Sequence, residues 1–118
     1  MVLVDTSLWV AHLRDGTTGL ETLLNEGQVI CHPFIIGELA CGNLRNRSEI
    51  LSLLYALPMA IHAECEEVMQ LIENYSLMGK GLGYIDMYLL SSAILTKVQL
   101  WTFNKKLNEV SSKLGLAY

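Results

Sequence analysis

Apolar residues along the chain fall into short aliphatic runs and longer stretches with helical spacing. The runs at 2–4, 28–32 and 98–102 predict buried strands of a parallel sheet, because strands covered on both faces are apolar throughout. The helical spacing predicts seven helices, at residues 6–13, 20–25, 33–41, 50–57, 64–77, 84–96 and from 104 onward. Strands that alternate with helices predict an α/β fold, a three-layer α/β/α sandwich with a mainly parallel central sheet.

Two segments of this pattern are ambiguous. Residues 59–62 favour a short strand only weakly, and residues 116–118 suit either an edge strand or a tail. The loop at 78–83 has glycines at alternate positions but lacks the preceding strand and full spacing of a nucleotide-binding motif. We expect this loop either to position Asp86 or to let the backbone come close to a bound substrate strand.

Three acidic residues stand alone in apolar surroundings. Asp5, Glu38 and Asp86 are each the only charged residue in their apolar segment. Burying a lone carboxylate costs several kcal/mol unless a partner or a ligand compensates it. We therefore predict that the three carboxylates converge on one internal site. The alternatives are local: Asp5 and Asp86 could be helix N-caps, and Glu38 could be a helical acid that faces water.

Composition limits the class of protein. With 118 residues, the chain predicts one domain, residues 1–118, and 52% hydrophobic residues suggest apolar surface that is covered by a partner or by a second copy. We expect no membrane span, since the longest charge-free run contains Pro58, and no signal peptide. The net charge of −4 argues against broad electrostatic binding to nucleic acid but allows a local basic rim.

Cysteine and histidine residues do not form a recognisable metal or disulfide pattern. The three cysteines include no C-x-x-C pair, which predicts reduced thiols in a cytoplasmic protein. The three histidines lack the spacing of a zinc site, so we interpret none of them as a metal ligand.

Four short motifs occur in a familiar order. Val4–Ser7, Gly37–Gly42, Gly83–Asp86 and Trp101–Asn104 together resemble the motifs of PIN-domain ribonucleases, in particular the VapC-type toxins of bacterial toxin–antitoxin pairs. The resemblance covers essentially the whole chain. It implies a metal-dependent endoribonuclease that leaves a 5′-phosphate and a 3′-hydroxyl on its RNA substrate. It also implies a VapB-type antitoxin partner, and we expect a homodimer.

The resemblance assigns roles to particular residues. It makes Asp5, Glu38 and Asp86 the acidic centre, with Asp5 and Asp86 as the principal magnesium ligands and Ser7 as a support for the first acid. The family usually has a further aspartate where this chain has Asn104. A neutral amide offers an oxygen but no charge, so we expect Asn104 to contribute to catalysis more weakly than an aspartate would.

Further candidates lie near the ends of the motifs. Thr102 is a second supporting residue, and Arg14, Lys80, Lys105 and Lys106 are candidates for guiding the phosphates of RNA. For each basic residue, an ordinary solvated surface side chain is the competing interpretation.

The chemistry of an acidic cluster agrees with the resemblance. Converging carboxylates repel one another and favour partial protonation unless a cation is bound. Hard oxygen ligands suit Mg²⁺, with Mn²⁺ as a substitute, and a bound ion can activate water for in-line attack on phosphorus. Two alternatives are a receiver-like phosphoacceptor domain and a catalytically weakened PIN-fold binding module.

Overall fold

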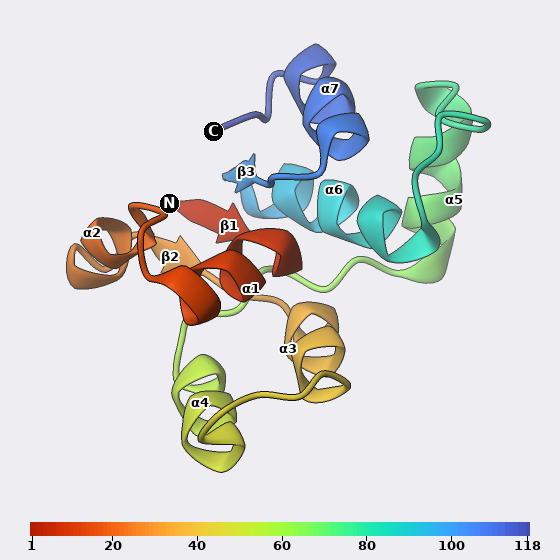
Figure 1. Cartoon of the computed structure of the whole chain (residues 1–118). Helices are drawn as coiled ribbons and strands as arrows, with labels where there is room; N and C mark the ends of the chain where they lie inside the picture. The colour runs from red at the N-terminus through yellow and green to blue at the C-terminus, as the bar shows by residue number, and fades with distance from the viewer.

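The computed structural model describes residues 1–118 and is built from three strands and seven helices around a parallel sheet (Figure 1). The elements follow one another as β1 (Val2–Val4), α1 (Thr6–Asp15), α2 (Leu20–Asn25), β2 (Val29–Ile30), α3 (Pro33–Ala40), α4 (Arg47–Tyr55), α5 (Cys65–Asn74), α6 (Tyr84–Thr96), β3 (Gln99–Trp101) and α7 (Lys105–Lys113). The predicted α/β class and the parallel sheet are confirmed.

Strand β1 lies in the middle of the sheet, whose order is β2-β1-β3. Leu3 pairs with Ile30 on one side and with Leu100 on the other, and both pairings are parallel. All three residues of β1 are buried, which explains why its sequence is apolar without alternation. The chain leaves this central strand at Asp5, on the edge where α/β sheets hold their ligands.

The ambiguous segments extend the sheet by single bridges only. Cys31 pairs with Met59, and Leu100 pairs with Ala117, each in parallel. The structure therefore has no full strand in either segment. The bridges nevertheless give the backbone of both segments a hydrogen-bonded partner, as buried polar groups require.

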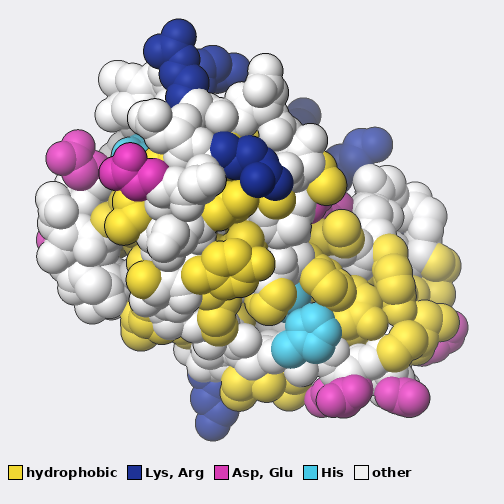
Figure 2. All heavy atoms as spheres, turned by 90° about the horizontal axis from the view of Figure 1, so that it is seen from below, with side chains coloured by type: hydrophobic (Ala, Val, Ile, Leu, Met, Phe, Trp, Pro, Cys, Tyr) yellow, Lys and Arg dark blue, Asp and Glu magenta, His cyan; other side chains and the backbone are white.

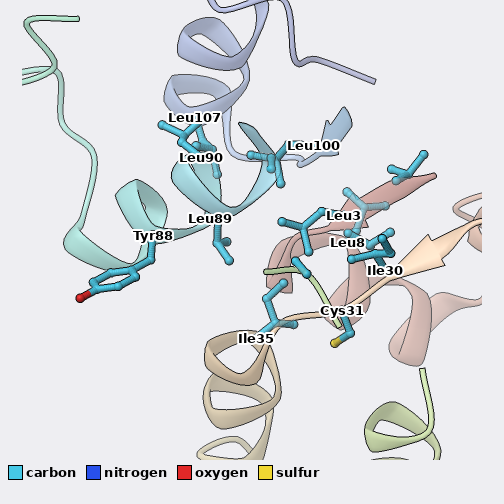
Figure 3. Close-up of a cluster of buried hydrophobic side chains, with 14 of the residues drawn as sticks. Leu3, Leu8, Ile30, Cys31, Ile35, Tyr88, Leu89, Leu90, Leu100 and Leu107 are labelled. Carbon is cyan, nitrogen blue, oxygen red and sulfur yellow. The ribbon is translucent and has the colours of Figure 1, made fainter. Parts of the chain in front are cut away.

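Helices cover the sheet on both sides and complete the three-layer sandwich. Figure 1 shows α1, α3 and α4 on one side of the molecule and α5, α6 and α7 on the other. Figure 3 shows Leu3 and Leu100 of the sheet pointing toward Leu89 of α6 and Ile35 of α3, whereas the ring of Tyr88 points away from them. These side chains belong to one core cluster of 26 buried residues.

Helix α6 is the most deeply buried helix, and its bounds match the prediction. Every residue from Met87 to Ala93 is buried, as expected for a helix that is apolar all round. Helix α4 differs from the prediction, because it begins at Arg47 and ends at Tyr55. The early end agrees with the following Pro58, which disfavours helical geometry in the residue before it. None of the helices has both the length and the apolar character needed to cross a membrane.

Candidate active site

Asp5 is the central acid of the candidate site. It directly follows β1, forms the N-cap of α1, and has 6% of its surface exposed. Its Oδ2 atom accepts hydrogen bonds from Ser7 Oγ at 2.8 Å and Thr102 Oγ1 at 2.7 Å, with a longer contact from Ser7 N at 3.4 Å. These bonds satisfy one oxygen of the buried carboxylate and fix its orientation. No hydrogen bond reaches Oδ1, so this oxygen remains available to a ligand.

Each of the two hydroxyl groups that bind Asp5 uses its single proton in that hydrogen bond. Ser7 Oγ accepts from Phe103 N at 2.9 Å, and Thr102 Oγ1 accepts from Asn104 N at 2.9 Å. Since each hydroxyl donates its single proton to Asp5, the 3.2 Å contact between Ser7 Oγ and Thr102 Oγ1 is not an additional hydrogen bond. The turn after β3 is thus tied to the start of α1 through one carboxylate.

Asp86 lies in the first turn of α6 and is half-buried. Its Oδ2 atom accepts a hydrogen bond from Gly83 N at 3.0 Å, which caps the helix. Burial raises the pKa of Asp86, the negative charge of Asp5 raises it further, and the bond from Gly83 opposes both effects. The carboxylate of Asp86 is therefore close enough to be affected by the charge of Asp5, and a cation nearby would favour the charged form of Asp86.

Glu38 approaches the site from α3 and is exposed. Thr6 Oγ1 donates a hydrogen bond of 2.6 Å to Glu38 Oε1, and Thr6 is the residue that follows Asp5. The sequence does not predict that Thr6 holds Glu38, although Thr6 lies between Asp5 and Ser7 in the sequence. Because Thr6 and Glu38 are 32 residues apart, local spacing gave no sign of their contact.

The three carboxylates are arranged more loosely than the sequence suggested. No three acidic, histidine or cysteine side chains lie close enough to hold one metal ion together. Asp5 and Asp86 are coupled through their charges, while Glu38 lies at the rim. The local interpretation holds for Asp5, which is the N-cap of α1, but the N-cap of α6 is Gly83, and Asp86 is the third residue of that helix, where its carboxylate accepts from Gly83 N.

The donor atoms fit a small divalent cation. Asp5 and Asp86 each use Oδ2 for hydrogen bonds and leave Oδ1 without one. Mg²⁺ commonly takes one or two carboxylates and completes its shell with water and phosphate oxygens. The free carboxylate oxygens are therefore of the type that such an ion binds.

Asn104 is placed as a helix cap. Its Oδ1 atom accepts a hydrogen bond of 3.1 Å from Leu107 N, and its backbone has the extended geometry of an N-cap residue. The amide oxygen of Asn104 is therefore used by α7. This geometry favours the capping role over a direct catalytic one.

Arg14 is directed toward a neighbouring carboxylate. Its guanidinium forms an exposed ion pair with Asp15 at 3.1 Å, and this contact raises the pKa of Arg14. Arg14 also lines a groove of about 720 Å³ between α1, α3 and α4, and Glu38 lies in the same groove. The groove thus extends from Glu38 to the loop at residues 42–46 and the first turn of α4.

Among the lysines, Lys106 has the most defined position. It extends from α7 across the glycine loop, so that a β-carbon on Gly81 would lie 2.7 Å from its Cδ and Nζ atoms. Gly81 also has a φ of +81°, a conformation that side chains disfavour. Lys80 and Lys105 are exposed and form no ion pair.

Comparisons with known proteins bear on the family and the fold of the chain. A model of the PIN domain matches residues 2–113. Ribonuclease VapC32 from two strains of Mycobacterium tuberculosis is 40% identical over 121 residues, which span 99% of this chain and 95% of the relative. The crystal structure of PAE2754 from Pyrobaculum aerophilum has a similar fold, with a TM-score of 0.61 at 15% identity over 97% of this chain and 88% of that one.

Proposed function

The chain belongs to the PIN-domain family, as a VapC-type ribonuclease, and from this membership we propose that it is a Mg²⁺-dependent endoribonuclease and the toxin of a toxin–antitoxin pair. The observation that carries the proposal is the pair of carboxylates, Asp5 and Asp86, each held by hydrogen bonds through one oxygen and free at the other. This pair supports a site for a hard cation beside a phosphodiester.

The residues of the site have distinct tasks in this proposal. When bound, a divalent ion supplies positive charge at the phosphate and lowers the pKa of a bound water. Asp5 and Asp86 hold that ion, and Ser7 and Thr102 fix the orientation of Asp5. Thr6 holds Oε1 of Glu38, so Oε2 is the oxygen that orients the attacking water or receives its proton. In-line attack then leaves a 5′-phosphate and a 3′-hydroxyl.

Metal-dependent cleavage by purified protein tests the proposal. Asp5→Asn and Asp86→Asn should abolish cleavage of single-stranded RNA, and a chelator should do the same to the unmodified protein. Glu109→Gln, an exposed acid on α7, is the matched control and should cleave normally. Full activity of Asp86→Asn, after host ribonucleases are excluded, would contradict the assignment.

The hydrophobic surface supports the proposed protein partners, a VapB-type antitoxin and a second copy of the chain. Figure 2 shows hydrophobic side chains gathered on one face, with a histidine among them and acidic groups near the border. Leu53 and Tyr55 on α4 are 60% and 67% exposed. An antitoxin segment in the groove beside α4 could bring an arginine to Glu38 and compete with the metal. A monomer in sedimentation at tens of micromolar would contradict the homodimer.

Residues 1–118 are proposed to act as one nuclease domain in the cytoplasm, where the three free cysteines remain reduced. Asp5 does follow the central strand, as a receiver phosphoacceptor would, but membership of the PIN-domain family does not support that alternative. The capping role of Asn104 is compatible with a binding module without activity, and the cleavage assay separates that alternative from an enzyme.

A further inference from the structure

Three aromatic side chains at the end of β3 and the C-terminus of the chain lie next to one another. Phe103 follows the site residue Thr102 and is 55% exposed. Its ring lies edge-on to Trp101, with centroids 6.4 Å apart, and Trp101 packs on Tyr118 at 5.0 Å. Tyr118 is 52% exposed. We refer to Phe103, Trp101 and Tyr118 as the aromatic ridge.

The inner end of the ridge is fixed relative to the acidic site. Phe103 N donates to Ser7 Oγ at 2.9 Å, and Ser7 Oγ donates to Asp5 Oδ2 at 2.8 Å. The backbone that carries the exposed ring is thus two hydrogen bonds from the proposed metal ligand. Leaving a large ring in water forgoes the free energy of burying it, so its exposure at this position favours a ligand that covers it.

Positive charge borders the same end of the ridge. Lys105 and Lys106 follow Phe103 closely at the start of α7, and Lys106 reaches across Gly81 in the loop that leads to Asp86. Rings that stack on bases, combined with basic side chains that follow the phosphates, are the usual features of sites for single-stranded nucleic acid. A binding site for another protein would not need both stacking rings and basic side chains next to the proposed metal ligands.

We propose that Phe103 forms a stacking subsite for a nucleobase next to the scissile phosphate, and that the ridge continues this subsite along single-stranded RNA. The proposal rests on the proposed ribonuclease function and adds the subsite that positions the substrate. Stacking on an aromatic ring is tolerant of sequence but requires an unpaired base. The ridge therefore selects unpaired RNA, such as a loop or an open strand, over a duplex.

Binding of defined oligonucleotides tests the subsite. The probes are fluorescein-labelled adenosine and uridine 12-mers, measured by anisotropy with Asp86→Asn protein to prevent cleavage. Adding Phe103→Ala should weaken binding about fivefold or more, whereas Phe103→Trp should retain it. Phe103→Leu should behave like alanine, because leucine is apolar but cannot stack. Tyr75→Ala removes an exposed ring directly after α5, at a residue outside both the ridge and the proposed partner surface, and should leave binding unchanged.

Several results would overturn the proposal. Equal affinities for Phe103→Ala and the parent would exclude a role for the ring, and parental affinity in Phe103→Leu would exclude stacking as its cause. Weaker self-association with unchanged RNA affinity would show that the ridge serves a protein instead. If Phe103→Ala fails to fold, the comparison of leucine with tryptophan decides.

The subsite and the proposed function can fail separately. Absence of metal-dependent cleavage by the unmodified protein would contradict the ribonuclease function, whatever the binding data show. Normal cleavage by the unmodified protein, with the same KM for the 12-mers in Phe103→Ala, would contradict only the subsite. We expect the substitution to raise KM at least about fivefold.

Discussion

Replacing Thr102 with valine would test whether the hydroxyl groups around Asp5 hold the site together. The Thr102 hydroxyl donates to the buried Asp5 carboxylate at 2.7 Å, and water has little access to replace it because Asp5 is 6% exposed. A hydrogen bond to a charged group contributes about 1.5–3 kcal/mol. Thr102→Val should therefore lower the free energy of unfolding by about that amount.

Thr102→Ser is the matched control, because it keeps the hydroxyl and removes only a methyl group, at a cost of about 1 kcal/mol or less. The difference between the two variants isolates the hydroxyl group. Urea unfolding followed by tryptophan fluorescence measures it, with a chelator present so that metal binding does not contribute. Free energies of unfolding within about 0.5 kcal/mol of each other would refute the reasoning, given the strength of such a bond.

Three further predictions concern the acids and the cap. Because the folded pKa of Asp86 is raised, its contribution to stability is greatest below the ordinary carboxyl pKa of 3.8 and decreases as pH rises through the higher folded value. Asp86→Asn should flatten that decrease and stabilise the metal-free protein near neutral pH, as urea unfolding across pH would show; an unchanged pH profile would contradict this. Thr6→Val should weaken cleavage by releasing Glu38, and Thr6→Ser should restore it; equal rates for both would show that the 2.6 Å bond has no role in catalysis. Asn104→Asp should cap α7 equally well, since Asn and Asp are similar N-caps, while its second oxygen lowers the magnesium concentration for half-maximal cleavage. Identical magnesium titrations would leave residue 104 with a capping role only.

Much of the framework could be predicted from the sequence because it depends on local patterns. The bounds of α6 follow from Gly83 before it and from the apolar run that continues to Thr96. The buried strand β1 follows from three consecutive aliphatic residues, and Asp5 is the residue at which that strand must end. The sequence also predicts apolar surroundings for Asp86, because its helix carries no other charged residue.

The contacts that organise the site were decided by tertiary structure. Ser7 and Thr102 are 95 residues apart, and both reach one oxygen of Asp5 only because β1 and β3 are neighbours with Val4 opposite Trp101. No periodicity encodes such a distance, since spacing along the chain fixes which face a residue occupies and not what lies across from it. The same limit applies to the Thr6–Glu38 bond, which depends on the packing of α1 against α3. Sequence could therefore identify the acids, whereas the fold determined which oxygen of each remains free to bind a ligand.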